Sequence, residues 1–204
     1  MALLDHKDRA RNFYKYFSRI YDYINPIFYS EKMREKVIEM AEIHEGAFVL
    51  EVGCGTGFTT IGIAKKTSPE RISCVDLTPE QIKRAKKKLN ANFFLGDAEN
   101  LPFKEKVFDS AISAGSIEYW PDPLKGISEM VRVTKNGGRV VILAPRSPKN
   151  PVIRKVAEKI MLFPSTEQCI DWFEKAGLKE IEYVEMGPYK VWSKLVVIIS
   201  GRVP

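Results

Sequence analysis

Short apolar runs alternate along the chain with segments in which apolar residues recur at helical spacing. The apolar runs predict strands at Phe48–Val52, Arg71–Asp76, Asn92–Gly96, Val107–Ser113, Gly138–Ala144, Leu178–Glu185 and Val191–Gly201. The segments between them predict helices at Thr59–Lys66, Pro79–Leu89, Pro123–Val133 and Ser165–Ala176. Strands that alternate with helices are typical of an α/β fold built on a parallel sheet.

Local residues mark where some of these elements begin. Pro79 and Pro123 suit a first helical turn, where a missing N–H costs nothing. Thr78 precedes Pro79 as an N-cap, and Gln81 follows it in the register of a capping box. The run Asn136-Gly137-Gly138 predicts a turn that leads into the fifth strand.

Two segments fall outside the alternating pattern. Residues 1–44 are rich in aromatic residues and are predicted to form a helical arm, and residues 145–164 carry four prolines between the fifth strand and the next helix. In open α/β sheets, ligands bind at the carboxyl ends of the strands, so additions there tend to cover the site. We therefore interpret 1–44 and 145–164 as lids over a pocket in a domain that spans 45–204.

Composition narrows the class of protein. With 204 residues, of which 45% are hydrophobic, the chain suits one domain with a full core. It has no apolar stretch of the roughly 20 residues that span a bilayer, and its start turns charged at Asp5, unlike a signal peptide. Three widely spaced cysteines and two histidines predict reduced thiols, a cytoplasmic location and no metal site.

The net charge of +6 is concentrated in Lys83-Arg84-Ala85-Lys86-Lys87-Lys88. This run has the pattern of a solvated helix face. One alternative is a nucleic-acid patch, but no aromatic residues interleave with it and no RNA-binding motif lies beside it. We therefore expect no nucleic-acid partner. Attraction to an anionic membrane surface is a third possibility.

A glycine loop follows the first predicted strand. Residues 51–57 read Glu-Val-Gly-Cys-Gly-Thr-Gly, directly between a strand and a helix. Glycines there permit a tight turn and let the backbone approach a ligand closely. A dinucleotide fingerprint has its third glycine one position later, so a dinucleotide oxidoreductase is the structural runner-up.

Polar or glycine residues also end the next three strands. Asp76 ends the second strand at the distance from the loop where an acidic side chain can accept ribose hydroxyls. Gly96-Asp97-Ala98-Glu99 ends the third, and Ser113-Ala114-Gly115-Ser116 ends the fourth. Each of these residues also has an ordinary structural interpretation; Asp97, for instance, can be a turn residue. Because four strand ends converge at one edge of a parallel sheet, together they predict a ligand crevice.

The motifs at these strand ends resemble those of the class I methyltransferases, and the resemblance extends from about Val49 to Gly201. The resemblance implies their Rossmann-like α/β fold, a seven-stranded, mostly parallel sheet with helices on both faces. It also implies S-adenosyl-L-methionine as cofactor, with S-adenosyl-L-homocysteine as product. The glycines would cradle the methionine part, Asp76 the ribose, and Asp97 with Ala98 the adenine. The implied cofactor-binding residues are Glu51, Gly53, Gly55, Thr56, Gly57, Asp76, Leu77, Asp97, Ala98, Ala114, Gly115 and Ser116.

A narrower resemblance rests on residues 113–123, Ser-Ala-Gly-Ser-Ile-Glu-Tyr-Trp-Pro-Asp-Pro. This string is similar to the plastid-type methyltransferases of 2-methyl-6-phytyl- and solanesyl-benzoquinol. Tyr21-Asp22-x-x-Asn25 resembles the wider ubiquinone/menaquinone methyltransferase family. Two features differ: plant members carry a C-terminal hydrophobic anchor beyond the position of Pro204, and ubiquinone-type enzymes have Arg-Asn where Ile117-Glu118 stands here.

A quinol acceptor reacts more readily once a phenolic proton leaves, so a base near the donor side would help. Glu118 is the first candidate because it follows the donor-side loop; the alternative is a solvent-exposed loop carboxylate. Asp22 and the two histidines are further candidates. Among the aromatic residues, Tyr21 and Tyr119 are the expected substrate contacts, although aromatic residues at helical spacing more often belong to a core.

The resemblance implies C-methylation of a prenylated benzoquinol or naphthoquinol in quinone biosynthesis. The alternatives are an N- or O-methyltransferase for a phospholipid headgroup or another small molecule, and a non-enzymatic regulator that binds S-adenosylmethionine. Because a prenyl tail stays in the bilayer, we expect peripheral contact with the inner face of the membrane, without a spanning segment. The oligomeric state stays open, with a homodimer as one option.

Overall fold

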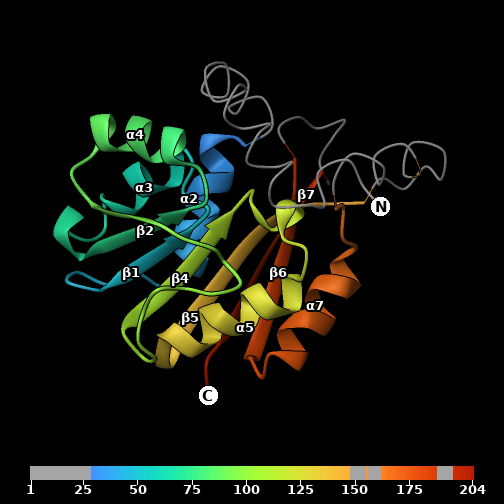
Figure 1. Ribbon diagram of the computed structural model, residues 1–204. Coiled ribbons are helices and arrows are strands. Elements are labelled where there is room, and N and C mark those ends of the chain that lie inside the picture. Colours follow the sequence, from blue (N-terminus) through green and yellow to red (C-terminus); the bar gives the residue numbers. More distant parts are fainter. Residues whose placement is uncertain (1–28, 148–154, 156–161, 188–194) are drawn as a thin grey trace.

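A computed structural model of the protein describes residues 29–147, 155, 162–187 and 195–204 (Figure 1). These residues contain a seven-stranded sheet in the order β3-β2-β1-β4-β5-β7-β6. The strands are β1 (Val49–Val52), β2 (Ile72–Asp76), β3 (Asn92–Leu95), β4 (Phe108–Ala114), β5 (Thr134–Pro145), β6 (Lys179–Met186) and β7 (Val196–Arg202). The helices are α2 (Glu31–Met40), α3 (Phe58–Ile63), α4 (Pro79–Lys88), α5 (Pro123–Val133) and α7 (Thr166–Lys175), with 3₁₀ turns η1 (Pro69–Arg71) and η2 (Ile117–Tyr119).

The first five strands pair in parallel, and β7 runs antiparallel to both of its neighbours, β5 and β6. This is the mostly parallel sheet that the resemblance implies, and the predicted strands and helices appear within a few residues of their expected bounds. Residues 191–194, where the last strand is predicted to begin, lie outside the described residues. The chain order reverses between β1 and β4, which lie side by side. In open α/β sheets the ligand crevice lies at such a point, beyond the carboxyl ends of the strands.

Strand β5 shows why the sheet is covered on both faces. Val140 and Ile142 belong to the hydrophobic cluster that α5 and α7 complete, whereas Val141 and Leu143 belong to the cluster that α2 and α3 complete. Successive side chains of a strand point to opposite faces, so an unbroken apolar run requires helices on both sides. Figure 1 shows α5 and α7 on one face of the sheet, with α2 and α3 on the other.

Two local predictions are wrong. Thr78 takes the N-cap position of α4, but its side chain makes no capping hydrogen bond. The Thr78 N–H donates instead to Asp76 (2.8 Å), and Gln81 is buried. The predicted turn at 136–138 lies inside β5, which begins at Thr134 and shifts register at this point against β4. A true capping box occurs at Ser165 and Gln168, at the start of α7.

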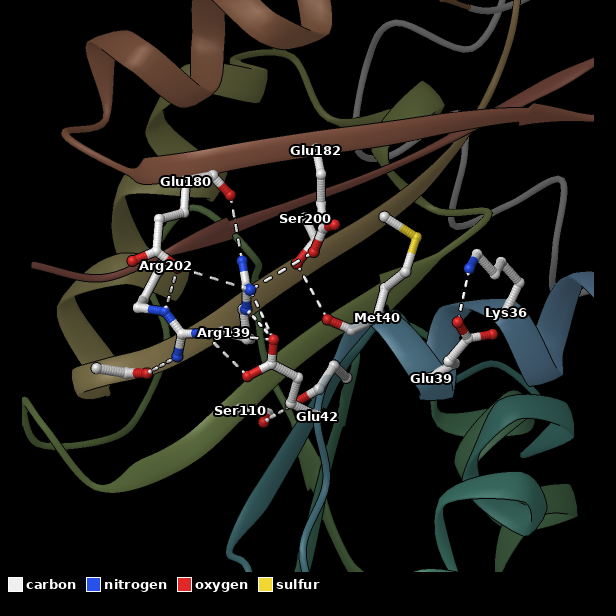
Figure 2. A network of polar contacts seen from close by, with 12 residues as sticks. Lys36, Glu39, Met40, Glu42, Ser110, Arg139, Glu180, Glu182, Ser200 and Arg202 are labelled. Atoms are coloured by element: carbon white, nitrogen blue, oxygen red, sulfur yellow. Dashed lines mark hydrogen bonds and ion pairs between the residues drawn. The ribbon is translucent and has the colours of Figure 1, made fainter.

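A polar network anchors the end of α2 to the sheet (Figure 2). The guanidinium of Arg139, only 7% exposed, donates to Glu42 just after α2 at 2.6 Å, and Arg202 donates to the same carboxylate at 3.0 Å. The hydroxyls of Ser110 and Ser200 donate to two carbonyl groups at the end of α2, at 2.7 and 3.1 Å. The network thereby fixes the helix whose other end reaches the candidate site.

Most of both predicted lids lies outside the described residues. The described end of the arm includes α2, whose Met33 and Val37 are fully buried in the core. The described end of segment 145–164 returns to the domain at Leu162, whose N–H donates to the carbonyl of Glu118 at 3.2 Å. Among the described residues, no helix has the length and the apolar composition needed to cross a bilayer.

Candidate functional site

A cleft opens at the carboxyl ends of β1 to β4 and encloses about 730 Å³ of space, part of it open to solvent. The cleft brings together many of the residues predicted from the sequence. Those that line it are Gly53, Gly55, Asp76, Leu77, Asp97, Ala98, Gly115, Ser116 and Tyr119.

A second hollow, of about 440 Å³, shares Gly53 and Gly55 with the cleft. The predicted residues Glu51, Thr56 and Ala114 line it, together with residues of α2. The remaining predicted cofactor residue, Gly57, lines neither space; it caps the N-terminus of α3 in the left-handed conformation. The two spaces therefore meet at the glycine loop.

The loop needs glycine at its first position for two reasons. Gly53 has φ +74°, which disfavours other residues, and a Cβ atom there would overlap the side chain of Ser116. The N–H of Gly53 donates to the carbonyl of Val75 (2.7 Å), and the hydroxyl of Ser116 donates to the carbonyl of Val52 (3.3 Å). The ends of β1, β2 and β4 are thus held together around the glycine.

Asp76 connects the second strand to the same loop. Its two carboxylate oxygens accept hydrogen bonds from the N–H groups of Gly55 and Thr78, both at 2.8 Å. Burial raises the pKa of Asp76, although these backbone N–H groups act in the opposite direction. A carboxylate oxygen accepts more than one hydrogen bond, so Asp76 keeps acceptor capacity toward the cleft that it lines.

Glu51 is almost fully buried, at 2% exposure, and accepts a hydrogen bond from the hydroxyl of Thr60. Burial raises the pKa of Glu51 to about 8, and the nearby charge of Asp76 adds to the rise, whereas the hydrogen bond from Thr60 opposes it. A positively charged group in the second hollow would favour the ionised form of Glu51.

Asp97, just after β3, has a position that suits both roles considered from the sequence, that of a turn residue and that of a ligand contact. Asp97 accepts a hydrogen bond from the N–H of Glu99 at 3.0 Å, as a turn residue does, and both residues line the cleft. Glu99 also accepts from the N–H of Asp122 at 2.9 Å, which ties this turn to the start of α5. By contrast, Asp109 lies near the amino end of β4 and pairs with Lys135 (2.7 Å), so it is outside the site.

Several lining residues were not predicted from the sequence, and four of them have polar or aromatic side chains that suit a ligand. Gln81 and Trp120 line the cleft, and Tyr29 and Arg34 line the second hollow. The oxygen of the Gln81 side-chain amide is buried and has no hydrogen-bond partner among the described residues. The Nε atom of Arg34 is likewise buried and without a hydrogen-bond partner among the described residues. The spacing of Gln81 from Thr78 predicts a helix cap, and Tyr29 belongs to the aromatic arm, so the sequence gives no signal that either residue lines the site.

Glu118 is buried, at 4% exposure, which excludes the solvent-exposed loop carboxylate considered from the sequence. It lies in the η2 turn, lines neither of the two spaces, and accepts a hydrogen bond from the hydroxyl of Tyr29 at 2.9 Å. Tyr119, on the same turn, does line the cleft. The other predicted aromatic contact, Tyr21, and the alternative base Asp22 lie outside the described residues.

Comparison with known proteins places this geometry in a family. Residues 50–142 match the model of a methyltransferase domain. The structure superposes on that of a SAM-dependent methyltransferase, possible histamine N-methyltransferase, from Thermotoga maritima, with a TM-score of 0.75 and 21% identity over 98% of this chain and 100% of that one. The chain thus carries a methyltransferase domain and has the class I methyltransferase fold, as the glycine loop and the sheet order indicate.

Within that class, the sequence is similar to methyltransferases of quinone biosynthesis. It is 43% identical to 2-methyl-6-phytyl-1,4-hydroquinone methyltransferase 1, chloroplastic, of Oryza sativa subsp. japonica, over 91% of this chain. The alignment spans 58% of the rice protein's length. A demethylmenaquinone methyltransferase of Desulfitobacterium hafniense is 26% identical over 97% of this chain and 92% of its own length.

Proposed function

We propose that the protein transfers a methyl group from S-adenosylmethionine to a ring carbon of a prenylated quinol. The observation that carries the cofactor half of this proposal is the presence of one acidic and one basic side chain on the second hollow. Glu51 and Arg34, both buried, line one small space beside the glycine loop. A carboxylate and a guanidinium suit the ammonium and carboxylate groups of an amino acid.

The same pair argues against a dinucleotide. A dinucleotide would bring its pyrophosphate to the glycine loop and the following helix. There, the buried carboxyl of Glu51 lines the space beside Gly53 and Gly55 and would repel that anion once ionised. The cofactor that fits both spaces has a nucleoside at one end, near Asp76, and a zwitterion at the other.

Each residue then has a defined task. Asp76 accepts the ribose hydroxyls, and Asp97 with Ala98 flanks the adenine in the wider cleft. Glu51 and Arg34 hold the amino-acid end in the second hollow. The bound cofactor supplies an electrophilic methyl group on its sulfonium. The rest of the catalysis is positioning, because an in-line displacement needs mainly near-attack geometry in a dry site.

The quinol half of the proposal rests on sequence. The similarity of 43% to the rice hydroquinone methyltransferase covers nearly the whole chain and includes the segment 113–123 on the donor side. This segment supplies Tyr119 and Trp120 to the cleft, where aromatic faces suit a ring substrate. The main alternative is N- or O-methylation of a phospholipid headgroup or another small molecule on the same cofactor domain.

Incubation with methyl-labelled S-adenosylmethionine tests the proposal. The acceptors are 2-methyl-6-prenyl-benzoquinols, demethylmenaquinol, headgroup phospholipids and buffer alone, and the product is analysed for ring-carbon or oxygen methylation. We expect label on a ring carbon of a quinol. Label on a lipid headgroup, or on a quinol oxygen, would favour the alternative, and binding without any transfer would favour a regulator.

We propose in addition that the protein meets its acceptor at a membrane surface. A tail of several prenyl units stays in the bilayer, because each buried methylene contributes about 0.8 kcal/mol. Co-sedimentation with vesicles that contain anionic lipid and a prenylated quinol tests this. We expect binding that decreases in high salt; protein that stays in the supernatant at low salt would indicate a soluble acceptor.

A further inference from the structure

Tyr29 and Glu118 form a contact between distant parts of the chain. The hydroxyl of Tyr29, just before α2, donates to the Oε1 atom of Glu118 in the η2 turn, 89 positions away, at 2.9 Å. The second carboxyl oxygen of Glu118 is buried and has no hydrogen-bond partner among the described residues. A buried carboxyl whose described partner is a phenol is costly for stability, so its presence calls for a functional reason.

The ring of Tyr29 also lies directly on the donor-side loop. A Cβ atom built at Gly115 would stand 2.8 Å from the Cζ atom of Tyr29 and 3.0 Å from its hydroxyl oxygen. Gly115 has φ +71°, so both its backbone and its neighbour exclude a larger residue. Tyr29 lines the second hollow together with Ala114, whereas Glu118 lines neither space. Gly115, on which the ring of Tyr29 lies, lines the wider cleft. Tyr29 therefore stands where the hollow and the cleft meet, and it is the one of the two residues that can reach an acceptor ring on the donor side.

We propose that Tyr29 and Glu118 form a proton relay, in which Tyr29 is the catalytic residue that takes the phenolic proton of the acceptor and Glu118 acts through it. This inference rests on the function proposed above and adds the residue that contacts the acceptor. It also revises the role expected of Glu118 from sequence, since that carboxyl reaches the acceptor only through the tyrosine.

The relay balances in protons and electrons. The acceptor's O–H bond breaks as its proton bonds to the oxygen of Tyr29, and the proton of Tyr29 moves to Oε1 of Glu118. The electron pair left on the acceptor oxygen enriches the ring, whose carbon forms the new bond to the methyl group while sulfur keeps the electrons of the broken bond. The ring carbon then loses its hydrogen to water, and Glu118 returns its proton through Tyr29 to the acceptor oxygen.

The electrostatics of Glu118 suit this task. Burial raises the pKa of Glu118 to about 7, and hydrogen bonds from its own backbone N–H and from Tyr29 oppose the rise. A base is most effective when its pKa lies near the working pH, so Glu118 can both accept and return a proton. Among the described residues, the ionisable side chains of Glu51 and Arg34 line the same hollow as Tyr29, and Tyr119 shares the η2 turn with Glu118.

Conservative variants test the relay. Tyr29→Phe removes one oxygen and keeps the ring on Gly115, and Glu118→Gln keeps the shape of the side chain. Tyr183→Phe, on an exposed tyrosine of β6, is the matched control. For each variant, calorimetry gives the affinity for S-adenosylhomocysteine, thermal denaturation checks folding, and quinol turnover is measured across pH.

We expect turnover to fall by about 10²- to 10⁴-fold in Tyr29→Phe and in Glu118→Gln, with no further loss in the double variant. The affinity for S-adenosylhomocysteine should stay at the wild-type value, and the rise of wild-type turnover near neutral pH should vanish in Glu118→Gln. Tyr183→Phe should behave as wild type.

The contrary results are distinct. A Tyr29→Phe variant with wild-type turnover overturns the relay, and if Glu118→Gln is then impaired, the carboxyl contacts the acceptor directly. Losses that multiply in the double variant also overturn it, because they indicate independent roles. A wild-type protein that binds S-adenosylhomocysteine but methylates no quinol overturns the proposed function itself.

Discussion

The Oδ2 atom of Asp76 accepts a hydrogen bond from the N–H of Gly55 at 2.8 Å, so the acid at the end of β2 also fixes the glycine loop after β1. The residue expected to bind the ribose therefore has a second task in the ligand-free protein. A substitution there removes a ligand contact and loosens the loop at the same time. Its test needs a variant that preserves the shape of the side chain.

Asp76→Asn should weaken the binding of S-adenosylhomocysteine by about 1.5–3 kcal/mol, or roughly 10- to 150-fold, because a charge-assisted acceptor is lost. Asp109→Asn is the matched control: Asp109 also accepts a backbone N–H, from Phe48 at 2.8 Å, but lies away from the cleft. Titration calorimetry measures both. Equal affinities in folded Asp76→Asn and wild-type protein would remove Asp76 from the binding site.

Gln81→Met should have opposite effects on stability and on binding. The buried amide oxygen of Gln81 has no hydrogen-bond partner among the described residues, so its replacement should raise the melting temperature of the ligand-free protein. The lost hydrogen bond to the ligand should reduce the affinity for S-adenosylhomocysteine by about 0.5–1.5 kcal/mol. Scanning calorimetry and titration calorimetry check the two signs. A variant that loses stability and keeps its affinity would make Gln81 a structural residue.

Arg34→Met should weaken the binding of one ligand and leave the binding of a second, shorter ligand unchanged. The substitution keeps an aliphatic side chain near the ring of Phe58, over which the guanidinium now lies at 4.7 Å, but removes the charge. Affinity for S-adenosylhomocysteine should fall about tenfold or more, because a hydrogen bond to a charged group contributes about 1.5–3 kcal/mol. Affinity for 5′-methylthioadenosine, which lacks the amino-acid end, should not change.

Glu31→Gln serves as the control for that variant. Glu31 pairs with Arg34 at 3.1 Å but is largely exposed, so this surface ion pair should contribute little. Its loss should leave both affinities at the wild-type value. If Arg34→Met weakened both ligands to the same extent, the guanidinium would be acting on the fold of the site and not on the carboxylate of the ligand.

The pH dependence of stability should reveal Glu51. Its pKa of about 8 in the folded protein lies above the ordinary value of 4.5, so between these values the folded state holds a proton that the unfolded chain releases. Stability therefore decreases as pH rises across this window, by up to about 1.4 kcal/mol per pH unit from this group. Glu51→Gln should show a smaller decrease between about pH 5 and pH 8 in urea unfolding. Parallel curves for variant and wild type would contradict the assignment.

The sequence by itself determined the sheet and most of the cleft. Strands such as β5 carry apolar residues on both faces, and this pattern alone requires a sheet covered on both sides. The glycine loop and Asp76 could be predicted because each directly ends a strand, and parallel strands bring their carboxyl ends to one edge. For such residues, position along the chain sets position in space.

Only the tertiary structure decided which side chains complete the site. Tyr29 and Glu118 are 89 positions apart. They meet because α2 packs on the sheet and thereby places Tyr29, the residue just before the helix, against Gly115. The role of Gln81 was also hidden, since Asp76 accepts from the N–H of Thr78 and Gln81 lines the cleft instead of capping the helix. Periodicity specifies which face of an element is apolar, but the partner of a single buried polar group depends on how whole elements pack.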